Sequence, residues 1–126
     1  MPSQREAETR LGISLPYRLV MALHDPSDPI RKRVDLLTLD DGPGGIVEAN
    51  EFLRPLEWRQ WPDYIIAFAS GGCGDYFAFD TRTVPYRVYY IDTLGTVAES
   101  IASCEQEAFV FESFDHWYVH EISQAA

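Results

Sequence analysis

The sequence predicts an α+β domain with a single antiparallel or mixed sheet and helices packed against one side of it. Residues 64–69 are apolar on both faces, as expected of a central strand. Residues 75–80 follow a glycine-rich turn and alternate in character, with Phe77 and Phe79 on one face. Helical patterns stand before and after this predicted hairpin, and that order of elements is typical of α+β domains.

Two short helices are expected at the start of the chain. Ser3 and Glu6 form a capping-box pattern, which predicts a first helix that Gly12 ends with a left-handed residue. Pro16 suits a first helical position because its missing N–H would have no partner there. A second helix is therefore predicted over residues 17–24.

The remaining elements are predicted from shorter patterns: a strand over 34–39, a helix over 46–53, a strand over 87–92 and a short edge strand over 108–111. Ser113 is a suitable cap for a final helix whose inner side carries Phe114, Trp117 and Tyr118. Residues 93–107 show no pattern that assigns them to an element.

The composition is that of one small domain. The chain has 126 residues, of which 46% are hydrophobic, so residues 1–126 are expected to share one core. Two cysteines, Cys73 and Cys104, are too few for a disulfide framework and are expected to be reduced. No apolar run approaches the about 20 residues of a spanning helix, and the polar N-terminus is no signal peptide. We therefore expect a cytoplasmic protein that does not enter a membrane.

The charge is strongly negative and unevenly distributed. The formal net charge is −10, and residues 88–126 hold seven acidic residues but no Lys or Arg. Such a surface repels nucleic acids and anionic lipids, and it attracts a basic protein. The alternative is that the acidic surface has no role in binding and only keeps the protein soluble.

Within the C-terminal third, a set of carboxylates is positioned for cationic side chains of a partner: Glu105, Glu107, Glu112, Asp115 and Glu121. Trp58 and Trp61 flank Arg59 in a segment with no clean period. These two rings either pack in the core or supply an aromatic anchor for the partner, since Trp is enriched at interface hot spots.

Three glycines, Gly71, Gly72 and Gly74, are interpreted as structural turn residues, because a tight link between strands needs φ values that other residues resist. The alternative, a phosphate cradle, lacks a following helix N-terminus and a nearby Lys. Cys73 in this turn is either an incidental thiol or a nucleophile. The negative field disfavours the thiolate that a nucleophile would need.

His116 and His120 lie four residues apart on one helix face, a spacing that chelates metals but also occurs on solvated helices. A zincin would carry Glu directly after the first His, where this chain has Trp117. No constellation combines a nucleophile, a base and oxyanion donors. We expect no catalytic residues, no metal and no cofactor.

Four segments, in order, resemble the SUKH superfamily: residues 8–18 (ETRLGISLPYR), 65–80 (IIAFASGGCGDYFAFD), 88–92 (VYYID) and 112–117 (ESFDHW). They are similar to that family's opening signature, its glycine-turn hairpin, its next strand and its Ser-Phe helix start. Two features depart from the pattern. No residues separate Leu-Pro from Tyr-Arg, and an Asn-Gly after the second helix is absent, so local differences are expected over residues 15–33.

The resemblance implies a protein that works by binding another protein. SUKH members include bacterial immunity proteins, which neutralise toxins delivered by neighbouring cells, and fungal regulators of cell-wall synthesis. Together with the acidic charge, it leads us to expect an immunity protein that binds a basic toxin domain, as a monomer or weak homodimer. The alternative is a regulatory or scaffold protein of the same fold.

Overall fold

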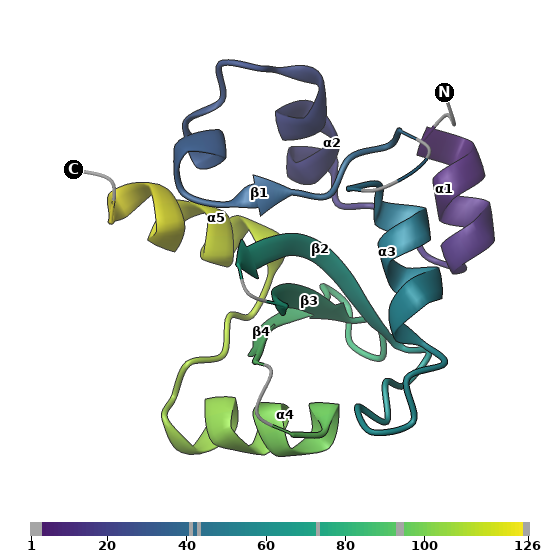
Figure 1. Ribbon diagram of the computed structural model, residues 1–126. Coiled ribbons are helices and arrows are strands. Elements are labelled where there is room, and N and C mark those ends of the chain that lie inside the picture. The colour runs from purple at the N-terminus through teal and green to yellow at the C-terminus, as the bar shows by residue number, and fades with distance from the viewer. Residues whose placement is uncertain (1–3, 41, 43, 73, 93–94, 125–126) are drawn as a thin grey trace.

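The fold is a four-stranded antiparallel sheet surrounded by helices (Figure 1). The computed structural model describes residues 4–40, 42, 44–72, 74–92 and 95–124. Within them the helices are α1 (Gln4–Leu11), α2 (Tyr17–His24), the 3-10 helix η1 (Pro29–Lys32), α3 (Ile46–Leu53), α4 (Val97–Gln106) and α5 (Phe114–Ser123). The strands are β1 (Asp35–Leu36), β2 (Ile65–Gly72), β3 (Asp75–Asp80) and β4 (Arg87–Ile91), adjacent in that order. The α+β fold expected from the sequence is confirmed.

The predicted hairpin is the centre of the sheet. Strands β2 and β3 pair from Ile65 opposite Asp80 to Gly72 opposite Asp75, with register shifts near Phe68 and Gly71. Ile65 to Ala69 are all buried, which explains why this strand is apolar on both faces.

The aromatic core lies between the hairpin and α5. Phe68 stacks on Phe79 with ring centroids 4.3 Å apart, and the Trp117 ring meets Phe68 edge-on at 4.9 Å. Trp117 is fully buried, and Phe114 packs beside it at 5.3 Å. Each such ring contributes several kcal/mol through burial and packing, so α5 is anchored to the sheet mainly by these contacts.

Asn50 joins α3 to the edge of β2. Its side-chain amide donates to the carbonyl of Ala67 at 2.9 Å and its oxygen accepts from the Ala67 N–H at 2.8 Å. A further bond reaches the carbonyl of Ile46 at 2.8 Å. The buried amide thereby takes the place of a neighbouring strand at this position, and it satisfies backbone groups that would otherwise be orphaned.

The N-terminal helices match the predicted ranges with one correction. Gly12 adopts a φ of +70° after α1, as the left-handed stop requires. Pro16 precedes α2 as its N-cap, with a ψ of 139°, instead of occupying the first helical position. Ser3, the expected cap of α1, lies outside the described residues. Among the described helices, none has the length and apolar character that crossing a membrane requires.

The largest difference from the sequence analysis is α4, in the segment that showed no pattern. Thr96 and Glu99 form a capping box that starts it. Figure 1 shows α4 at the β4 end of the sheet, opposite β1 and α2. Two predicted strands are shorter in the structure. Of the strand predicted over 34–39, only Asp35 and Leu36 form a strand, and of the one predicted over 108–111, only Phe111 pairs, in an isolated bridge with Val88.

Candidate partner-binding surface

Four of the five predicted carboxylates are exposed. Glu105 lies near the end of α4 and Glu107 is its C-cap, while Asp115 occupies the first turn of α5. Glu112 lies 3.9 Å from Arg87, an exposed pair of little energetic weight. These side chains are therefore accessible to cations from a second molecule.

For the fifth carboxylate, Glu121, the prediction of an exposed contact residue is wrong. It is 7% exposed, and its oxygen lies 3.6 Å from the guanidinium of Arg33. Arg33 belongs to a distant part of the sequence, next to η1, which packs against α5. Glu121 therefore holds α5 within the fold and does not form part of an exposed contact surface.

The two tryptophans separate into one exposed and one buried ring. Trp61 is 5% exposed, donates its Nε1–H to the carbonyl of Ile65 at 2.8 Å and meets Tyr76 edge-on, so the expectation of a partner contact fails for it. Trp58 is 59% exposed. Buried Arg59 lies between them, 5.0 Å from the Trp58 ring and 5.6 Å from the Trp61 ring. The exposed Trp58 ring therefore packs against a buried side chain, which is the arrangement expected of an anchor residue at an interface.

The turn between β2 and β3 contains glycines in conformations and close approaches that other residues resist. Gly72 and Gly74 adopt φ values of +91° and +85°. Gly71 has a different reason: a Cβ there would lie 2.9 Å from the ring of Tyr90. That ring is fixed, because the Tyr90 hydroxyl donates to Asp75 at 2.5 Å. Cys73 lies outside the described residues.

Other candidate chemistry is accounted for by packing. The Cys104 thiol is buried beneath the Tyr90 carbonyl, and burial raises its pKa, with nearby carboxylates adding to the effect. The rings of His116 and His120 lie 5.4 and 5.0 Å from Phe111. Within the described part of the chain, no group of three or more His, Cys, Asp or Glu residues is arranged to hold a metal ion.

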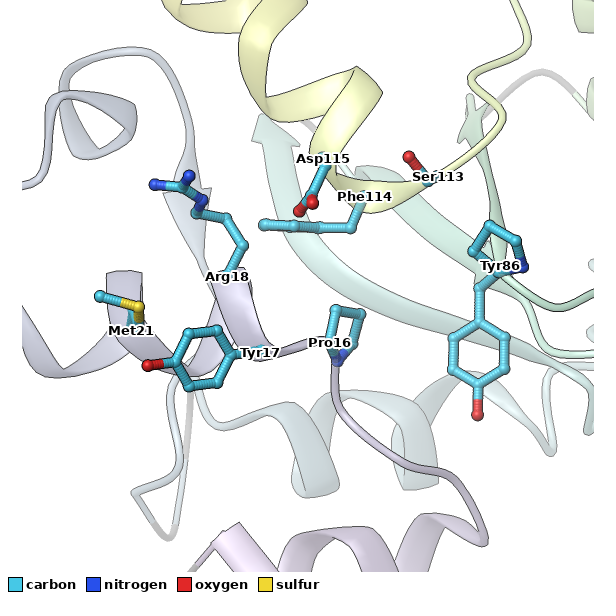
Figure 2. Close-up of a pocket in the computed structure, with 9 residues that line it drawn as sticks. Pro16, Tyr17, Arg18, Met21, Tyr86, Ser113, Phe114 and Asp115 are labelled. Atoms are coloured by element: carbon cyan, nitrogen blue, oxygen red, sulfur yellow. The ribbon is translucent and has the colours of Figure 1, made fainter.

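Sequence reasoning missed a surface groove between the start of α2, the start of α5 and the loop before β4. Figure 2 shows Pro16 and Tyr17 across from Phe114 and Asp115, with Tyr86 at one end. This part of the groove has a volume of about 350 Å³. Most of its walls come from two segments quoted above for their family resemblance, 8–18 and 112–117, which the fold brings together beside Met21, Pro85 and Tyr86. The resemblance of both segments to family motifs was the sequence feature that could have indicated this groove.

A comparison with family models confirms the resemblance to the SUKH superfamily. The model of the SMI1 / KNR4 family (SUKH-1) matches residues 5–119, which is nearly the whole chain. The chain belongs to the SMI1/KNR4 family. Comparisons with curated proteins and with solved structures find no match.

The match to the SMI1/KNR4 model covers every element described above except Gln4 of α1 and the end of α5. It is consistent with immunity or regulatory roles that act through protein contacts, and the family is not known as an enzyme family. In this SMI1/KNR4 chain, exposed carboxylates, the Trp58 ring and the apolar groove are the features available for such contacts.

Proposed function

We propose that this protein is a cytoplasmic immunity protein that neutralises a toxin by binding it directly, without catalysis or a cofactor. The observation that carries the proposal is the charge of the C-terminal third. Residues 88–126 contain no Lys or Arg. Five of their carboxylates are exposed: Glu99, which caps α4, and the predicted contact residues Glu105, Glu107, Glu112 and Asp115.

A basic toxin domain is the partner that this surface would attract. Opposite charges steer two proteins together and raise the association rate by about 10- to 1,000-fold at low salt. Nucleases and other toxins that act on anionic substrates carry basic clefts, so an acidic inhibitor suits them electrostatically. The exposed Trp58 ring would supply apolar contact area, which charges alone do not provide.

The alternative is a regulatory or scaffold protein, a role with which membership of the SMI1/KNR4 family is equally consistent. Both functions rest on protein contact. They differ in the partner: a scaffold would bind a resident protein of the same cell, and its loss would not sensitise the cell to a toxin.

The test is to search beside the gene of this protein for a basic toxin-like domain and to measure its binding; the absence of such a neighbour would count against the proposal. We expect tight binding and rescue of growth when both are co-expressed. The charge reversals Glu105→Lys, Glu107→Lys and Glu112→Lys, made together, should weaken binding at least tenfold and reduce its dependence on salt.

A matched control reverses three exposed acids elsewhere: Asp40→Lys, Glu48→Lys and Asp63→Lys. Both triple variants have a formal net charge of −4 instead of −10, so only the location of the change differs. Equal affinities for the two variants would show that the C-terminal third is not the contact surface. Failure of the wild-type protein to bind or protect would reject the immunity function.

A further inference from the structure

The groove beside α2 is longer than the part drawn in Figure 2. A second hollow of about 380 Å³ continues it along Ser14, Leu15 and Val84. The two hollows share Pro16, Pro85 and Tyr86 as walls. Together they form one surface channel with two adjacent depressions.

The rim of this channel exposes large apolar side chains. Tyr17 is 78% exposed, Val84 94% and Met21 47%. In a chain with a net charge of −10, a cluster of exposed apolar groups around a groove is typical of a binding site, because such groups gain free energy only when something covers them.

Hydrogen bonds and core packing hold two parts of the walls in place, Tyr86 and the backbone of Ser14 and Leu15. The hydroxyl of Tyr86 accepts a hydrogen bond from the backbone N–H of Ser14 at 3.2 Å, and its ring packs 5.7 Å from Phe79 in the core. The N–H of Leu15 donates to the carboxylate of Glu8 at 2.7 Å. A groove with fixed walls loses little entropy when it is filled.

One end of the channel is charged. Asp115 is exposed and forms no ion pair within the described ranges, and its carboxylate lies beside the hollow in Figure 2. Arg18 also lines this end, but its guanidinium lies over the ring of Tyr118, 4.9 Å from the centroid. The carboxylate is therefore available to an incoming cation, which the negative field of the whole protein also favours.

We propose that this groove binds an extended, proline-containing segment of the partner, oriented with a Lys or Arg toward Asp115. The inference rests on the proposed function and names the part of the partner that this surface recognises. An extended polyproline helix has no internal hydrogen bonds and is ordered before it binds, and its rings pack against tyrosine and proline faces. The two adjacent depressions, walled by Pro16, Tyr86 and Pro85, can each hold one proline ring of the partner segment. The carboxylate of Asp115 can pair with a Lys or Arg that flanks these prolines.

The test uses a panel of fluorescent ten-residue peptides with proline at every third position and two arginines at one end, titrated by anisotropy. We expect the best of them to bind with a Kd of about 10–300 μM, the range of weak peptide docking. Tyr17→Ala should weaken binding by about tenfold, and Asp115→Asn by about two- to fivefold with a flatter salt dependence. Phe52→Ala removes an exposed ring on α3, 66% accessible, and should change nothing.

Three outcomes would overturn the proposal: no peptide of the panel binding below 1 mM, binding unaffected by Tyr17→Ala, or equal binding of helix-forming peptides in which alanine replaces every proline. Measuring Tyr17→Ala against the toxin domain separates the two proposals. If the toxin domain binds this variant as it binds the wild type, the groove proposal falls and the immunity function stands. If the peptides bind in the groove but the toxin domain does not bind at all, the reverse holds.

Discussion

The aromatic residues of this protein fall into two regions with opposite surroundings. Between α5 and the hairpin, Phe68, Phe79 and Trp117 are fully buried, and Phe68 contacts both of the other rings. On the surface, Tyr17 and Trp58 are more than half exposed. The buried rings stabilise the fold through their mutual packing. The exposed rings contribute little to stability, so their contact energy remains available to a partner. Substitutions in the two regions should therefore separate folding from binding.

The largest effect is expected at Trp117. Trp117→Ala should lower the free energy of unfolding by about 3–5 kcal/mol, because it leaves a cavity against Phe68. Trp117→Phe should lose less, since it keeps an aromatic ring and removes an Nε1–H that is buried with no hydrogen-bond partner among the described residues. Urea denaturation measures both. A loss under about 1 kcal/mol for Trp117→Ala would show that this region does not hold the core.

A smaller loss is expected at Asn50. Asn50→Ala should cost about 1–3 kcal/mol, because the N–H and carbonyl of Ala67 lose their partner in a buried position. The neighbouring Glu51→Ala removes an exposed ion pair with Arg10 and should stay within about 0.5 kcal/mol of the wild type. Equal losses for the two variants would argue against a role for Asn50 as a bridge between α3 and β2.

The pH dependence of stability should reveal Asp80. Burial alone would raise the pKa of its carboxyl, but hydrogen bonds from the side chain and backbone of Arg82 lower it overall. A lowered folded-state pKa gives stability that is present above the unfolded pKa of about 3.9 and is lost as the pH falls through the folded value. Arg82→Ala should therefore destabilise the protein at pH 7, by about 0.5–1 kcal/mol, since Arg82 is largely exposed.

The same variant should show a shallower loss of stability below pH 4, where the wild type also loses the interaction. Thermal unfolding measured from pH 3 to pH 7 checks both parts. Parallel curves for the two proteins would mean that Arg82 does not set the protonation of Asp80.

The smallest effect on stability, and a large one on binding, is expected at Trp58. Trp58→Ala should change the free energy of unfolding by at most about 0.5 kcal/mol, because the Trp58 ring is mostly exposed and Arg59 keeps its contact with the ring of Trp61. Binding of the toxin domain should weaken by about tenfold. Trp61→Ala is the control, since it should destabilise the fold. A Trp58 variant that binds normally would remove this ring from the contact surface.

The buried region could be predicted from the sequence and the exposed one only in part. Residues 64–69 and 75–80 read as a hairpin because continuous burial leaves a continuous apolar pattern. Helix α4 escaped notice because its buried positions include Ser100 and Cys104, which give no apolar stripe. The capping box at Thr96 and Glu99 was the visible sign of its start.

Long-range placement explains the remaining differences. Nothing in the segment around Glu121 indicates that Arg33, far away in the sequence, would hold it in the interior. The groove is likewise formed by segments from the two ends of the chain and by the loop at Pro85. Periodicity identifies which residues of an element face the interior, but it does not identify which elements meet.

Both margins of the sheet are already occupied or very short. At the β4 edge, the backbone of Val88 exchanges hydrogen bonds with the backbone of Phe111, and the carbonyl of Tyr90 accepts a hydrogen bond from the Cys104 thiol. At the other margin, β1 has two strand residues, and Asn50 covers the neighbouring stretch of β2. Among the described residues, a second copy of the chain therefore meets no long row of unpaired amides to extend. Concentrated solutions of the protein should resist fibril formation, although the apolar strand β2 has the kind of sequence that aggregates when its edge is exposed.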